Sequence, residues 1–80
     1  MEAKLIDCIL EIMRGELRLF SSDITTDELK PIATRLYRFI QAGDSKIALE
    51  QFVATELTKL NAAPNPYAAV VARATALLRN

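Results

Sequence analysis

Apolar residues recur at steps of three and four along most of this 80-residue chain, as in the segment from Leu5 to Phe20. That spacing places them on one face of an α-helix, whereas a strand would show strict alternation of apolar and polar residues. The residue types agree, because strong helix formers dominate and the chain holds only two glycines. The pattern therefore predicts an all-α protein.

Short polar or proline-containing segments divide the chain into four such stretches. We expect helices at residues 2–20, 27–42, 45–61 and 66–79. Four helices of similar length with short connections favour an antiparallel up-down-up-down four-helix bundle. A chain of this length forms one domain, which we expect to cover residues 1–80.

The start of the second helix carries a specific signal and one ambiguity. Thr25 has Glu28 three residues later, which is the spacing of a capping box. Pro31 complicates the boundary, because proline fits only the first turn of a helix. Either the helix begins near Asp27, or a short turn over residues 26–30 leads into a helix at Pro31.

Other boundaries depend on single residues. Gly43 supplies the left-handed conformation that commonly ends a helix, and Asp44 is the expected N-cap of the next one. Asn65 is the expected cap of the last helix, with Pro66 at its first position. Gly15 lies inside the first helical pattern, where it allows either the close approach of a neighbouring helix or a kink.

The residue inventory offers no pattern for catalysis. The chain has no histidine and a single cysteine, so it can form neither an intrachain disulfide nor a zinc site of its own. Cys8 lies next to the apolar stripe of the first helix, which predicts a small buried side chain. Asp7 and Glu11 are one turn apart, but without a histidine partner they indicate a solvated face. We expect a protein without enzymatic activity, metal or cofactor.

Charge excludes one large class of partner. Ten acidic and ten basic residues give a formal net charge of zero, whereas nucleic-acid binders usually carry a basic excess on one element. All the acids lie between Glu2 and Glu56, so the segment after Glu56 is locally basic. The N-terminus lacks the pattern of a signal peptide, and no uncharged stretch would span a bilayer as one apolar helix. With a single thiol, this favours a cytoplasmic protein.

Two surfaces are candidates for binding. Arg35 and Arg38 lie three residues apart on the second helix, either on an ordinary solvated face or in a partner site. Tyr37 beside them is either an exposed aromatic anchor or a cover for the edge of the bundle. The last helix is rich in alanine and nearly uncharged, so it is either enclosed by the others or docks onto another protein, a second copy or a membrane surface.

Three segments carry a family resemblance: Thr-Asp-Glu-Leu at residues 26–29, Phe-Ile-Gln-Ala-Gly-Asp-Ser at 39–45, and Leu-Asn-Ala-Ala-Pro-Asn-Pro at 60–66. Together with the four amphipathic helices, they resemble the small immunity proteins that protect lactic-acid bacteria from pediocin-like (enterocin A-type) bacteriocins. The resemblance spans most of the chain.

That resemblance implies a cytoplasmic four-helix bundle without enzymatic activity. It would act at the inner face of the membrane, on the sugar-uptake transporter that the bacteriocin targets. Specificity in the family is associated with the C-terminal half, which corresponds here to residues 65–80 and includes Tyr67, Arg73 and Arg79. The alternative hypothesis, from another functional class, is a homo-oligomeric structural or regulatory module such as a homodimer.

Overall fold

The computed structural model describes residues 2–17, 24–60 and 67–79, and these ranges contain helices and turns but no strand. The helices are α1 (Glu2–Leu17), α2 (Thr26–Gln41), α3 (Lys46–Lys59) and α4 (Tyr67–Arg79). The predicted all-α, four-helix chain is confirmed. The predicted ends at residues 18–20, 61 and 66, including the Asn65 cap, lie outside the described residues.

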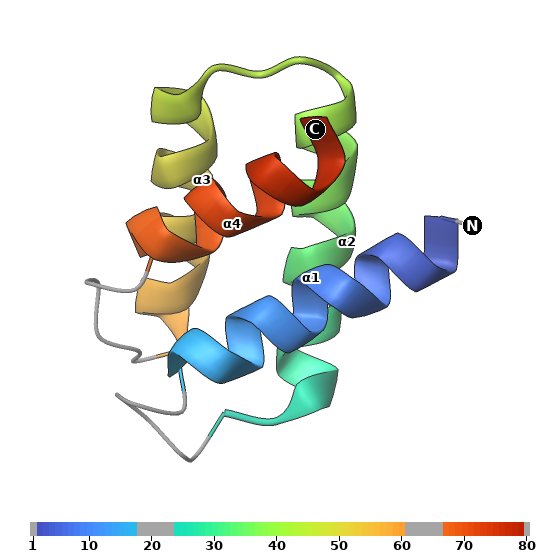
Figure 1. The fold of residues 1–80 in the computed structure, drawn as a ribbon. Helices are drawn as coiled ribbons and strands as arrows, with labels where there is room; N and C mark the ends of the chain where they lie inside the picture. Colours follow the sequence, from blue (N-terminus) through green and yellow to red (C-terminus); the bar gives the residue numbers. More distant parts are fainter. Residues whose placement is uncertain (1, 18–23, 61–66, 80) are drawn as a thin grey trace.

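The helices form two crossed layers (Figure 1). The layer at the back holds α2 and α3, which lie side by side and run in opposite directions; α1 and α4 form the front layer and also run in opposite directions. Helices α2 and α4 each contact the other three, whereas α1 and α3 do not touch within the described ranges. Neighbours within a layer are antiparallel, but an up-down-up-down alignment of all four axes is not confirmed.

One apolar core lies between these layers, and every helix contributes to it. The described part of the chain has no buried charged residue. Helix packing therefore supplies the stability, as expected for a chain without disulfides. The buried core residues are Ile6, Ile9, Leu10, Met13, Leu29, Ile32, Ala33, Leu36, Ile40, Leu49, Val53, Leu57, Val70, Val71 and Ala74.

The capping box predicted for α2 is confirmed. The Glu28 amide donates to Thr25 Oγ1 at 3.3 Å, and the Thr25 amide donates to Glu28 Oε1 at 2.9 Å. The helix therefore starts before Pro31, which is the first of the two alternatives. Pro31 lies inside α2 and is exposed. Because proline has no N–H, the Asp27 carbonyl lacks its helical hydrogen bond, and water can donate to it instead.

The turn between α2 and α3 is built on Gly43, whose φ of +88° confirms the predicted left-handed residue. Its amide donates to Ile40 O at 3.1 Å, and the Asp44 amide donates to Phe39 O at 3.2 Å. This is a Schellman ending. The next N-cap is Ser45, whose Oγ accepts from Ala48 N at 3.2 Å. The prediction of Asp44 as that cap was wrong by one residue, because the Schellman bond already engages Asp44.

Gly15 has no packing role. Helix α1 continues through it to Leu17, and a Cβ at this position would meet nothing within 4 Å. The expected close approach of a neighbouring helix was therefore wrong. Gly15 is exposed on α1.

Candidate binding surface

Arg35 joins α2 to α3. Its guanidinium lies 5.0 Å from the centre of the Phe52 ring, and its Nη1 is 3.8 Å from Glu56 Oε1. Phe52 in turn meets Phe39 edge to face, with 5.0 Å between ring centres. A cation over an aromatic face is attracted by the ring quadrupole. Arg35 therefore has a packing role within the fold.

Arg38 differs from Arg35, although the sequence grouped them. It is exposed, and it forms no ion pair with a residue that the structure describes. Tyr37 between them is partly buried against the core, and its hydroxyl accepts a hydrogen bond from Gln41 Nε2 at 3.2 Å. Tyr37 thus covers the edge of the core, which was one of its two predicted roles.

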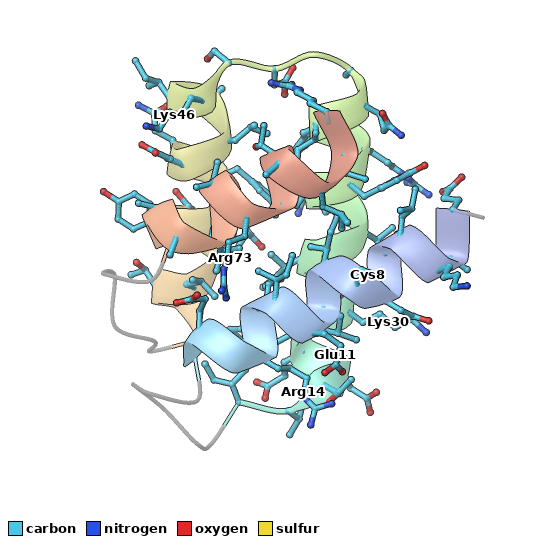
Figure 2. The ribbon with its side chains drawn as sticks, in the orientation of Figure 1. Cys8, Glu11, Arg14, Lys30, Lys46 and Arg73 are labelled. Carbon is cyan, nitrogen blue, oxygen red and sulfur yellow. The ribbon has the colours of Figure 1, made fainter. Side chains whose placement is uncertain are left out.

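Arg73 connects the two helices of the front layer. Its Nη1 lies 2.9 Å from Glu16 Oε1, so α4 is tied to the last turn of α1. In Figure 2 the Arg73 side chain extends from α4 toward α1. Exposed ion pairs of this kind contribute about 0.2–1 kcal/mol. Arg73 is one of the two cations of α4 that were predicted to bind a partner, and this ion pair engages it within the fold.

Arg79 holds the end of α2. Its Nη2 donates to the carbonyl oxygens of Ile40 and Asp44, both at 3.0 Å. The last carbonyls of a helix lack intrahelical donors, and a cation there also opposes the helix dipole. No sequence signal points to this contact, because its acceptors are main-chain atoms 39 and 35 residues away.

Tyr67 is partly buried against the core at the start of α4. It lines a shallow hollow of about 140 Å³, which it shares with residues of α3, among them Ile47 and Ala54. Ile47 is the second residue of α3, and 69% of it is exposed.

Helix α4 carries an apolar strip of its own. Ala68, Ala72 and Ala76 are all exposed and follow one another at intervals of one helical turn. We call Ile47 with these three alanines the α3–α4 face. The core-facing side of α4 is formed instead by Val70, Val71 and Ala74. Helix α4 is thus half enclosed, with an uncharged strip left in solvent.

A larger open groove of about 370 Å³ adjoins this face, and sequence reasoning missed it. It is lined by Lys46, Leu49, Val71, Ala72, Thr75, Ala76 and Arg79. The Thr75 hydroxyl is buried and has no hydrogen-bond partner among the residues that the structure describes. An unsatisfied buried hydroxyl costs about 1–3 kcal/mol. The groove therefore combines apolar walls, two cations and one polar group whose hydrogen-bonding capacity is unused.

Cys8 corrects a prediction. The thiol is exposed on α1, although a buried side chain was expected. It lies one residue before the fully buried Ile9, and one residue on a helix corresponds to a rotation of about 100°. In the described ranges, no three Cys, Asp or Glu side chains lie close enough together to hold a metal ion.

Comparison with protein-family models, with curated proteins and with solved structures finds no match to this chain. Among the helices described, none has the length and apolar character needed to cross a bilayer.

Proposed function

We propose that this chain is a non-enzymatic binding protein of the bacteriocin-immunity type, which protects its cell by contacting a membrane-associated protein through the α3–α4 face. The observations that support the proposal are the exposure of Ile47 on α3 and the strip of exposed alanines on α4. Apolar patches on the surface of a small protein are typical of contact sites for other proteins. The resemblance of three sequence segments to immunity proteins supplies the biological setting.

The contact we propose is mainly apolar. Arg73 and Arg79 lie in the region to which the resemblance assigns specificity, but both have partners within the fold. The alanine strip lies on the same helix and is free of such contacts in the described part of the chain. Helix α4 can therefore contribute a smooth surface that a partner helix approaches closely, with Ile47 as an anchor from α3.

Expression in a bacterium sensitive to pediocin-like peptides tests this function. The protein should raise survival against at least one member of a peptide panel. Ile47→Glu and Ala68→Glu each place a carboxylate on the α3–α4 face, at the second residue of a helix, where an acid suits the helix dipole. Both variants should fold and lose protection.

Ala3→Glu is the matched control, because Ala3 is an exposed alanine at the second position of α1. It should protect as well as the unmodified protein. If no peptide of the panel is countered, the immunity function is wrong. If Ile47→Glu protects as well as Ala3→Glu, the function stands and the proposed face is wrong.

The same face supports a second candidate, a homo-oligomeric module. Two copies of the chain can pack this uncharged strip against itself around a two-fold axis, because no like charges would repel each other there. Light scattering at micromolar concentration should then give about twice 8.9 kDa, falling to 8.9 kDa in Ile47→Glu. A mass of 8.9 kDa for the unmodified chain at every concentration would remove this candidate.

A further inference from the structure

The groove between α3 and α4 has the size and lining of a small-ligand site. Its volume of about 370 Å³ falls at the lower end of the range of about 300–1,000 Å³ found for ligand pockets. Figure 1 shows that α3 begins and α4 ends at the same end of the molecule, next to the turn that joins α2 to α3. Leu49 and Val71 form the buried base of the groove, and Ala72 and Ala76 form its exposed apolar wall. A ligand that fits must present aliphatic surface.

The charged groups that line this groove are both cations, Lys46 and Arg79. Lys46 Nζ lies 3.9 Å from Glu50 Oε2, and 76% of the lysine side chain is exposed. Such a loose surface pair contributes little and exchanges readily. Lys46 is therefore available to another anion, and Figure 2 shows it at the beginning of α3.

Arg79 is available in a different way. Its Nη2 donates hydrogen bonds to the main-chain carbonyls of Ile40 and Asp44, and these bonds hold the guanidinium in place. A guanidinium has five N–H donors, so those on Nη1 and Nε remain for a ligand as far as the described residues are concerned. Because the group is already held, little side-chain entropy is lost when it binds an anion.

Thr75 also lines this groove. Thr34 and Thr58 satisfy their hydroxyls by donating to the carbonyl four residues earlier, at 2.9 Å and 2.7 Å. The Thr75 hydroxyl does not do this and is buried without a partner. The Thr75 hydroxyl lies beneath the surface of the groove and is not counted as a contact of the ligand.

We propose that this groove binds a single-chain aliphatic carboxylate, a fatty-acid-like molecule, with its chain along Ala72 and Ala76 and its carboxylate between Lys46 and Arg79. The charge of the rim selects the head group, since a carboxylate only accepts hydrogen bonds and both cations only donate. The site does not depend on the proposed function, because no partner protein is needed to form it.

Titration of the isotope-labelled full chain with decanoate, followed by amide chemical shifts, tests the proposal. Saturable shifts should cluster at Lys46, Leu49, Ala72, Ala76 and Arg79. Decanol should bind more weakly, and decyltrimethylammonium weaker still. In Lys46→Gln the Kd for decanoate should rise about two- to fivefold, as expected for an exposed charge pair, and Lys46→Glu should weaken binding further.

Lys59→Gln is the matched control. Lys59 is on the same helix, is also exposed and also pairs with a glutamate, Glu56, but it does not line the groove. Its Kd should equal that of the unmodified protein. Arg79 is left intact because it also holds the end of α2.

Three results would overturn the proposal. The first is equal affinity for decanoate and decanol, which would mean that the cations do not select the ligand. The second is a set of shifts that spreads over the surface without saturating. The third is a response of the groove residues to phosphatidylglycerol vesicles but not to free decanoate, which would identify a membrane contact. None of these results bears on protection against a bacteriocin, so the two proposals fail independently.

Discussion

Replacement of Arg79 by methionine should destabilise the protein, although the residue is largely exposed. The substitution removes two hydrogen bonds of 3.0 Å from a charged donor and leaves the aliphatic stem. A hydrogen bond to a charged group contributes about 1.5–3 kcal/mol. Here the value is lower, because water can replace the donor at the exposed Asp44 carbonyl and Ile40 O also accepts from Gly43 N. We expect a loss of about 1–2 kcal/mol in the free energy of unfolding.

Urea and thermal unfolding followed by circular dichroism measure this loss. For a domain of this size, each kcal/mol lowers Tm by about 4–8 °C. Amide exchange should also accelerate at Gly43 and Asp44, because the turn that Arg79 holds opens more often. A general loss of helix packing would instead accelerate exchange throughout the core.

Arg38→Met provides the comparison, since it removes the same charge from the last turn of α2. Arg38 is exposed and donates no hydrogen bond to a carbonyl of the described residues, so its change should stay within about 0.5 kcal/mol. Equal unfolding free energies for Arg38→Met and Arg79→Met would refute the reasoning. Arg79 would then be free for a partner, as its position in the sequence first indicated.

Three further substitutions and one chemical reaction test other features. Thr75→Val should stabilise by about 1 kcal/mol in urea unfolding, because it removes a buried hydroxyl without a partner; a loss of stability would mean that the hydroxyl is satisfied in solution. At both glycines an added Cβ meets nothing within 4 Å, so backbone conformation alone decides the effect on stability. Gly43→Ala should lower the free energy of unfolding by about 1 kcal/mol, because Gly43 has a φ of +88°. Gly15→Ala in α1 should raise it by about 0.5–1 kcal/mol, because alanine favours the helix. The same sign for both would contradict the assigned backbone conformations. Cys8 should react with a thiol reagent in the folded protein about as fast as in urea, and strong protection would argue against its exposure.

The helices, the capping box at Thr25 and the helix ending at Gly43 were predictable because their signals are local. A capping box needs only Thr25 and Glu28, and a Schellman ending needs only a residue such as Gly43 that tolerates positive φ. The arrangement of the helices was not predictable in the same way. Whether helices align or cross depends on how side-chain ridges of one helix fit the grooves of another, and no short segment encodes that fit.

The position of a residue around its helix was also only partly predictable. Cys8 directly precedes the buried Ile9 and was expected to be buried as well, yet it is exposed. Ile47 is an apolar residue two positions before the buried Leu49, and it is exposed too. Burial depends on how far the neighbouring helices extend. Ile47 is the second residue of α3, and Tyr67 borders the hollow beside it without covering it. Exposed apolar residues of this kind are therefore found only when the packing is known.

The charges show most clearly why a partner surface could not be read from the sequence. The segment after Glu56 is locally basic, which suggested cations that await a partner. In the fold, Arg73 meets Glu16 from the other end of the chain, and Arg79 meets carbonyl groups that carry no formal charge and so do not enter a charge count. Both arginines thus hold helices together, and the exposed apolar residues of α4 are Leu77 and the three alanines. The contact that we propose through α4 therefore relies on apolar surface and not on these two arginines.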